Sequence, residues 1–405
     1  PWLHRPEMLV ITGSRQTGKT FLVHTIIPHS LKKQVLYYNF EDFSLRGLFH
    51  KDPHGFVAAL RNSNNLYIFD EFQHVPQLIS LLKVAYDTQK QLFPKILLTG
   101  SSSLAIQEHV SQSLTGQAML FHLFSLSFAE RFRHSTVDFI TQPPQIHSLQ
   151  NEWHLHTPQL QQQLTEYMRD GGYPELGELP MQLRPEKLSS IIQTILEKDM
   201  TRLVKEEYLF AAKQLLDIFA SRIGQRISFE AIASMLQLNV KTVRHLASII
   251  AGLFFIDFVY PRSSHGNEYK KSPKVYFHDA GIRNTLLHIA ELPTDMDQWG
   301  SLVEQFVFHQ LVRFSAYQRD LSIHYWQDYN KNEVDFVVEY ENNLISIEVK
   351  YQQSQTNRLA VGIRNFITRY KPKYHITVTK EYIGETLFNG CPVYFIPAHL
   401  FGLLI

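Results

Sequence analysis

The sequence of 405 residues is poor in cysteine, in net charge and in long apolar segments. Its single cysteine, Cys391, excludes an internal disulfide bond and fits a reducing compartment. A formal net charge of +1 gives no global attraction to nucleic acid, so such a contact would need a local patch. The apolar segment from Leu246 to Ile256 is far shorter than the roughly 20 residues that span a bilayer. We therefore expect a cytoplasmic protein with no membrane partner.

The most informative segment lies near the N-terminus. An apolar run from Met8 to Ile11 predicts a buried strand, and the run from Phe21 to Ile27 predicts a helix that ends before Pro28. Between them the spacing G-x-x-x-x-G-K-T is that of a phosphate-binding loop. Its residues are Gly13, Ser14, Arg15, Gln16, Thr17, Gly18, Lys19 and Thr20.

The chemistry of phosphate binding explains the residue types in this loop. The two glycines let the backbone close on an anion, while loop N–H groups and the helix N-terminus direct partial positive charge at the β-phosphate. Lys19 would reach the β- and γ-phosphates, and the Thr20 hydroxyl would be a ligand of Mg²⁺. The alternative is a glycine-containing turn that fits the pattern by chance. The loop therefore predicts a site for ATP and Mg²⁺.

Alternating strand-like and helix-like segments predict an α/β fold, with a parallel sheet covered on both faces. Further strands are expected at 34–40, 66–71, 95–101 and 119–124. The strand ending at Asp70 and Glu71 carries two carboxylates to the edge where such sheets bind ligands. Asp70 would hold Mg²⁺, and Glu71 would orient or deprotonate the attacking water. Ser101, with Thr99 as second choice, could sense the γ-phosphate; a turn that caps a helix is an equally suitable interpretation.

These elements resemble a widespread group of bacterial and archaeal AAA-type ATPases. The resemblance includes the loop, the Asp70-Glu71 pair and the segments 97–102 and 126–130, and it implies Mg²⁺-dependent ATP hydrolysis. That group usually has an arginine in a Leu-x-Gly-Arg element before the last strand. This chain has Gln117 at that position. The sequence therefore supports ATP binding better than fast ATP hydrolysis.

The middle of the chain is expected to be helical after a surface connection over 133–156, in which His154 and His156 are surface residues rather than metal ligands. The Gly-Gly-x-Pro turn at 171–174 and the segment 198–202 again resemble the ATPase group, which implies a helical lid beside the nucleotide.

Two short helices at 228–236 and 240–252, followed by a strand at 254–260, look like a winged helix-turn-helix. The DNA-reading version would present Lys241, Thr242, Arg244 and His245 to the major groove. Two cations on that helix are few for a phosphate contact, so an intramolecular packing module is the alternative.

A predicted β-hairpin at 332–350 carries the second candidate centre. Glu348 and Lys350 share one strand face, and Asp335 on the partner strand can lie beside them, which suits a divalent metal with a nearby ammonium. A charged hairpin face is the alternative. The arrangement D-x12-E-x-K is similar to the restriction-endonuclease-like (PD-(D/E)XK) family, and this resemblance implies Glu304 as a further metal-binding acid. The segment 276–283 resembles the domain that follows this type of ATPase.

We thus expect an ATPase whose nucleotide state controls a nuclease-like domain acting on nucleic acid, DNA more than RNA. The alternative is an ATP-driven switch in which an inactive nuclease fold serves as a scaffold for a protein partner. The expected domains are a P-loop ATPase domain (1–133), a helical lid or linker (134–225), a winged helix-turn-helix (226–262) and a nuclease-like domain (263–405).

Overall fold

The protein forms two compact units, each with its own core. The computed structural model describes residues 2–31, 33–60, 65–89, 93–101, 114, 116–136, 138–139, 142–262, 272–293, 299–317, 320–351 and 358–404, without the side chains of 89, 152–155 and 317. The first unit comprises Pro1–Phe124, Glu197–Leu203 and Gly252–Phe254, and the second comprises Ser125–Leu196, Val204–Ala251 and Phe255–Ile405. Within the described ranges, none of the helices combines the length and apolar character that crossing a bilayer requires.

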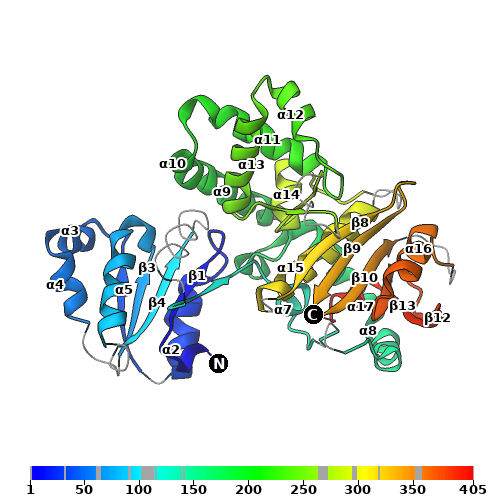
Figure 1. Cartoon of the computed structure of the whole chain (residues 1–405), viewed down its shortest axis with the longest axis horizontal. Helices are drawn as coiled ribbons and strands as arrows, with labels where there is room; N and C mark the ends of the chain where they lie inside the picture. The colour runs from blue at the N-terminus through cyan, green and yellow to red at the C-terminus, as the bar shows by residue number, and fades with distance from the viewer. Residues whose placement is uncertain are drawn as a thin grey trace. The chain divides into compact units, whose positions relative to one another are not determined.

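The first unit is built on a five-stranded parallel sheet with the order β2-β3-β4-β1-β5 (Figure 1). Its strands are β1 (Met8–Thr12), β2 (Gln34–Asn39), β3 (Asn65–Asp70), β4 (Lys95–Gly100) and β5 (Ala118–His122). The helices include α1 (Lys19–Phe21), α2 (Ile27–Leu31), α3 (Phe43–Lys51), α4 (Pro53–Ala58) and α5 (Gln77–Gln89). This confirms the predicted α/β class and the predicted strands.

Alternate residues of the strands enter two separate cores, one on each face of this sheet. Met8 and Val10 pack with residues of α3 to α5 such as Leu82. Leu9 and Ile11, which point to the other face, pack with Val23 and Ile27 of the helix after the loop. Burial on both faces explains why these strands read in the sequence as continuous apolar runs.

The helix after the loop continues through Pro28, so the predicted end before this proline is wrong. A π-helical segment at Leu22–Ile26 lies between α1 and α2, and the Ile27 N–H donates to the Leu22 carbonyl oxygen, five residues back. Proline normally interrupts a helix by its missing N–H and by a clash with the carbonyl four residues earlier. The wider turn changes this spacing, which lets the helix extend to Leu31.

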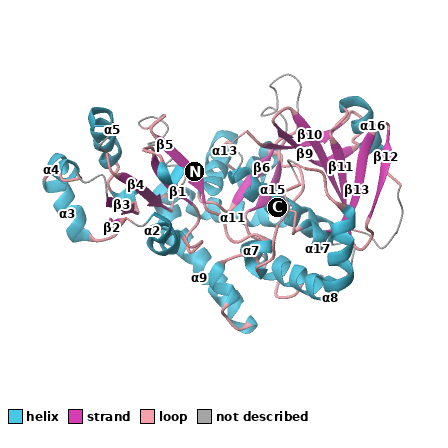
Figure 2. Ribbon diagram, turned by 90° about the horizontal axis from the view of Figure 1, so that it is seen from below, coloured by secondary structure: helices cyan, strands magenta, loops and turns pink. Residues whose placement is uncertain are grey.

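The second unit contains a six-stranded mixed sheet with the order β12-β13-β11-β10-β9-β8 (Figure 2). Its strands are β8 (Ser322–Gln327), β9 (Glu333–Tyr340), β10 (Asn343–Lys350), β11 (Tyr374–Thr379), β12 (Gly384–Phe388) and β13 (Cys391–Pro397). α15 (Trp299–Tyr317) packs through Phe308 on Tyr276, which also contacts Phe336. α16 (Val361–Tyr370) packs through Phe366 on Trp326 and Val337. The adjacent residues Phe336 and Val337 point to opposite faces, so one helix covers each face.

The second unit contains further helices, in addition to a small two-stranded sheet. They are α7 (Phe128–Phe132), α8 (Ile146–Asp170), α9 (Arg184–Thr194), α11 (Leu209–Ser221), α12 (Phe229–Leu236), α13 (Val240–Gly252), α14 (Ala280–Leu286) and α17 (Ala398–Phe401). β6 (Ile256–Val259) pairs in antiparallel fashion with β7 (Lys274–Phe277). The two short helices and the strand after them thus lie where the sequence predicts them, and the strand pair spans the domain boundary expected at residue 262.

Two other expectations differ from the structure. The boundary expected at residue 133 lies inside the second unit, where Phe128 contacts Tyr167 and Phe306 with ring centroids 5.9 and 5.8 Å away. The connection expected over 133–156 is helical from Ile146 onward. The helix α8 contains Pro158 in its interior and therefore begins well before this proline. The backbones of His154 and His156 both lie in this helix, and the side chain of His154 is outside the described residues.

The Gly-Gly-x-Pro turn and Asp279 form one buried junction in the second unit. Gly171 has a φ of 77°, and a Cβ there would lie 1.9 Å from Asp279 Oδ1. The Gly172 N–H donates to Asp279 Oδ2 at 2.8 Å, and Ser125 Oγ donates to the same oxygen at 2.7 Å. Arg313 donates to Ser125 in turn. The two segments singled out by resemblance, 171–174 and 276–283, therefore have a structural role.

We predict that Gly172→Ala destabilises the protein, because its Cβ would lie 2.0 Å from the Leu126 carbonyl oxygen. Overpacking of this kind should lower the free energy of unfolding by about 1–3 kcal/mol, as measured by chemical denaturation. Gly177→Ala is the matched control, because no heavy atom lies within 4 Å of its added methyl group. Equal stability of the two variants would contradict the close packing at Gly172.

Candidate functional site

The predicted phosphate-binding loop lies between β1 and α1 and depends on two glycines. A Cβ at Gly13 would lie 2.1 Å from the Leu123 carbonyl oxygen, so only glycine fits beside the end of β5. Gly18 adopts a φ of 95° directly before α1, and Gln16 is left-handed with a φ of 60°. Ser14 is buried between them. These backbone conformations form the tight loop that the sequence predicts.

Lys19 lies beneath the loop, with only 6% of its surface exposed. Its Nζ donates to the carbonyl oxygens of Gly13 at 3.0 Å and Ser14 at 2.6 Å, and Thr17 Oγ1 also donates to the Ser14 oxygen. Burial lowers the pKa of Lys19 to about 8. Its partners in the loop are neutral dipoles, so the ammonium retains its attraction for a polyanion.

The carboxylate of Asp70, at the end of β3, lies near hydroxyl groups from three other elements. It is 3% exposed and accepts bonds from Tyr37 at 2.5 Å and from Thr99. The Thr20 hydroxyl lies 3.4 Å from Asp70 Oδ2. The structure thus brings together the two predicted ligands of Mg²⁺, whose hydroxyl and carboxylate oxygens are of the type that this ion prefers.

Glu71 follows Asp70 in a left-handed conformation with a φ of 53°. Its Oε2 accepts bonds from Ser101 at 3.3 Å and from Gln73. Burial raises the pKa of Glu71. Ser101, the predicted sensor of the γ-phosphate, thus contacts the predicted base, while Thr99 contacts Asp70. Gln73 is a contact that the sequence pattern does not reveal.

The loop pattern predicts Arg15 as a residue that binds the nucleotide, whereas its partner in the structure is a carboxylate. Its guanidinium forms a bidentate pair with Asp199, with Nε to Oδ2 at 2.6 Å and Nη2 to Oδ1 at 2.8 Å. Glu41 lies further away, at 3.9 Å. Asp199 is 5% exposed and lies in the π-helical segment Ile195–Met200. The loop is therefore tied to a segment distant in sequence; no local pattern indicates this pair.

The second candidate centre contains all four residues that were expected there. β9 and β10 place Asp335 opposite Glu348, whose Oε2 accepts from the Asp335 N–H at 3.3 Å. Lys350 Nζ lies 2.7 Å from Glu348 Oε1. Burial and the neighbouring Asp335 raise the pKa of Glu348 to about 8 and that of Glu304, on α15, to about 7.

A fifth residue, Lys274 on β7, lies among these carboxylates and was not foreseen. It is 2% exposed. Its Nζ lies 2.9 Å from Glu304 Oε1, 3.5 Å from Asp335 Oδ1 and in contact with Glu333. In the part of the chain that the structure describes, no group of three His, Cys, Asp or Glu side chains is arranged to hold a metal ion. The predicted metal ligands Glu304, Asp335 and Glu348 therefore stay a prediction.

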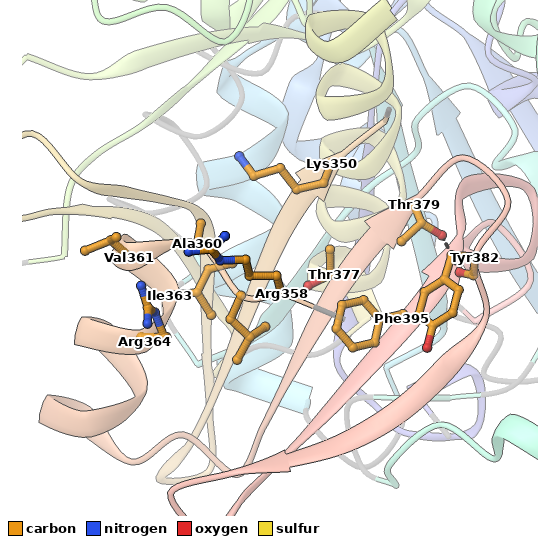
Figure 3. A pocket seen from close by; sticks show the side chains of 11 residues that line it. Lys350, Arg358, Ala360, Val361, Ile363, Arg364, Thr377, Thr379, Tyr382 and Phe395 are labelled. Atoms are coloured by element: carbon orange, nitrogen blue, oxygen red, sulfur yellow. Dashed lines mark hydrogen bonds between the residues drawn. The ribbon is translucent and has the colours of Figure 1, made fainter. Parts of the chain in front are cut away.

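A cavity of about 380 Å³ adjoins Lys350 (Figure 3). It lies at the carboxyl ends of the parallel strands β10, β11 and β13 and at the start of α16. Lys350, Arg358 and Arg364 supply positive charge, and Phe395 and Tyr382 supply aromatic surface. Such a lining suits a ligand with an anionic group and an apolar or planar part.

Comparison with known families matches the chain in three segments. Residues 5–132, which include the parallel sheet and the loop, match a family model described as an AAA domain. Residues 161–292 and 299–398 match two models described as domains of unknown function, DUF8612 and DUF4143.

Relatives in sequence extend over most of the chain. An uncharacterized protein of Methanocaldococcus jannaschii is 26% identical over 366 residues, which cover 82% of this chain and 73% of that protein. An uncharacterized protein of Haemophilus influenzae is 22% identical over 408 residues, which cover 96% and 92%.

Similar solved structures include the RuvB Holliday junction branch migration motor of Thermotoga maritima, with 15% identity, a TM-score of 0.29 and coverage of 65% of this chain and 87% of that one. The Aeropyrum pernix ORC1 protein in complex with DNA has 12% identity, a TM-score of 0.28 and coverage of 70% and 87%. TM-scores this low support neither an activity nor a partner.

Proposed function

We propose that this protein, whose first unit has an AAA-type P-loop fold, binds ATP with Mg²⁺ and hydrolyses it slowly. The observation that carries the proposal is the arrangement of Lys19 in the loop with Asp70 and Glu71 at the end of β3, a strand of the same parallel sheet. A buried ammonium near two carboxylates at the ligand-binding edge of a parallel sheet supports phosphoryl transfer from a nucleotide to water.

The described residues suit the separate parts of this reaction. Lys19 would exchange its bonds to loop carbonyls for bonds to β- and γ-phosphate oxygens. Thr20 and Asp70 would hold Mg²⁺, which when bound neutralises negative charge on the phosphates. Glu71, held by Ser101 and Gln73, would take the proton of the attacking water, and its raised pKa brings its basicity nearer to the working pH.

Slow turnover follows from Gln117, which replaces the arginine of the resembling group. Its side-chain amide donates to Asp87 Oδ1 at 2.5 Å. This neutral, engaged group cannot supply the positive charge that stabilises the transition state of phosphoryl transfer. A hydrolysis rate that suits a switch better than a motor is the expected consequence.

The pair of Arg15 and Asp199 supports a switch in the first unit. A γ-phosphate that reached Arg15 would compete with Asp199 for the guanidinium, because a phosphate and a carboxylate can each accept two hydrogen bonds from this group. The segment Glu197–Leu203 is joined in the chain to residues of the second unit on both sides. A change at Asp199 would thus be passed along the backbone in both directions.

The second unit, in this proposal, engages nucleic acid under control of the nucleotide. The cationic cavity beside Lys350 supports an anionic partner. DNA is favoured over RNA because α12 and α13 have the order of a helix-turn-helix. Arg244 on α13 pairs with Glu230 at 3.2 Å and covers the Phe229 ring, so the exposed Lys241 and His245 are left for a phosphate contact. A scaffold for a protein partner is the rival function.

We predict that Lys19→Ala weakens ATP binding about 100-fold or more, because it removes charge-assisted bonds to two phosphates. Titration with a fluorescent ATP analogue in Mg²⁺ measures the effect. Lys51→Ala is the matched control, because Lys51 is an exposed lysine of the same unit. Unchanged affinity in Lys19→Ala would refute the phosphate site.

Glu71→Gln should separate binding from hydrolysis. The amide keeps the shape of the side chain but cannot accept a proton, so we expect the rate of phosphate release to fall roughly 100- to 1,000-fold while ATP affinity stays within about threefold. Single-turnover kinetics and equilibrium titration report the two quantities. A wild-type rate in this variant would exclude Glu71 as the base.

For the second unit, we predict that a duplex oligonucleotide binds at low salt and that ATP changes its affinity in the wild type but not in Lys19→Ala. Replacing Arg358 and Arg364 by Ala should reduce the dependence of log affinity on log salt by about one unit per arginine. Lys213→Ala, which removes an exposed cation of α11, should leave it unchanged. A protein partner captured only with ATP, together with no DNA binding, would favour the scaffold.

A further inference from the structure

The carboxylates of the second centre already have partners at the oxygen atoms that a metal ion would use. Asp335 Oδ1 lies 3.5 Å from Lys274 Nζ, and Asp335 Oδ2 accepts from the Val349 N–H at 2.9 Å. Glu348 Oε1 pairs with Lys350 at 2.7 Å, and Oε2 accepts from the Asp335 N–H at 3.3 Å. All four oxygens of this opposed pair thus face a donor.

The third acid, Glu304, has donors at one of its two oxygens. Its Oε1 accepts from Lys274 Nζ at 2.9 Å and from the Tyr276 hydroxyl at 2.5 Å, which uses both lone pairs of that oxygen. Gly224 lies beside Oε2, since a Cβ built on this glycine would be 3.0 Å from that oxygen. Glu304 is therefore enclosed by protein groups.

From this geometry we infer that the Lys274 ammonium takes the place of a divalent cation in the second centre, which therefore binds its partner without cutting it. An ammonium has three N–H donors, and three carboxylates lie around this one: Glu304, Glu333 and Asp335. A divalent ion bonded to the same oxygens at roughly 2.0–2.6 Å would occupy the same space as the ammonium and be repelled by its charge.

Lys274 is also held too firmly to leave easily. It pairs with Val259 in the two-stranded sheet and forms an isolated bridge with Arg226. Its ammonium lies 5.7 Å from the centroid of the Tyr325 ring. Withdrawing one partner from a buried ion cluster leaves uncompensated charge, which is costly. The lysine is thus a permanent member of the centre.

The consequence for function rests on the proposed function of the second unit. Metal-assisted cleavage of a phosphodiester needs an activated water and a charge that stabilises the transition state, and both normally come from the metal. A fixed ammonium cannot activate a water in that way. Lys350 lines the cationic cavity, where a phosphate group would compete with Glu348 for its ammonium. Recognition without cleavage is the result.

The test measures Mn²⁺ binding to the full chain without nucleotide, in a Lys19→Ala background, by electron paramagnetic resonance. We expect the parent to hold no Mn²⁺ in the second centre. Lys274→Met, which keeps the length of the side chain and removes its charge, should gain one site and tighten Mn²⁺ binding at least about tenfold, because carboxylates are released as ligands. Lys274→Arg keeps the charge and should stay without metal.

Lys350→Met is the matched control, because it removes a lysine that is half exposed and pairs with Glu348; we expect it to gain no site, because Lys274 stays in place. Circular dichroism shows whether each variant folds. A parent that binds Mn²⁺ and loses it in Glu304→Gln would overturn the inference, and so would a folded Lys274→Met that gains no site. If Lys274→Met does not fold, the parent and Lys274→Arg decide.

Plasmid DNA with Mg²⁺ and ATP should stay uncut by the wild type, as by Asp335→Ala and Lys350→Ala, and metal-dependent cutting by the wild type alone would also overturn the inference. ATP and DNA binding by the same proteins test the proposed function separately, because neither requires a metal ion in the second centre.

Discussion

Burial of an ammonium group requires oxygen atoms around it, and the kind of oxygen decides what the group can do next. Lys95 Nζ donates to three backbone carbonyls, and burial lowers the pKa of this lysine to about 8. Lys19 is held in the same manner by two loop carbonyls. Lys274 is held by carboxylates instead; burial alone would lower its pKa, but the neighbouring Tyr276 and acids raise it well above the usual range. The charge of Lys19 is thus free to attract a polyphosphate, whereas that of Lys274 is neutralised.

Close backbone contacts fix the geometry of the loop and of the junction at Asp279. The Leu123 carbonyl oxygen lies where a side chain at Gly13 would be, and three residues later the Leu126 carbonyl oxygen does the same at Gly172. In the first unit this contact closes the loop against β5. In the second unit it allows Gly172 to bond Asp279. Interiors as dense as these do not deform gradually, so polar groups placed by them keep their geometry.

The sequence predicted much of this arrangement because the decisive signals were local. Strands buried on both faces read as continuous apolar runs, the spacing of the loop places Lys19, and the hairpin brings Asp335 near Glu348. Asp70 was found because the ends of parallel strands meet at one edge of a sheet. The continuation of the helix through Pro28 was missed because no sequence pattern indicates the π-helical turn that makes room for this proline. Asp199 and Lys274 were missed because each acts through partners far away in the chain, and no period or spacing encodes such a pair.

The two centres therefore differ in the charge that each has left for a ligand. In the first, Lys19 faces neutral dipoles while Asp70 and Glu71 lie at the open end of the sheet, an arrangement that a polyphosphate with a divalent ion completes. In the second, every oxygen of Asp335 and Glu348 already has a donor, so a metal ion would have to displace these donors. Its positive charge lies instead around the neighbouring cavity. In the proposed function, phosphoryl transfer therefore belongs to the first centre and recognition of an anion to the second, and a switch needs only these two functions.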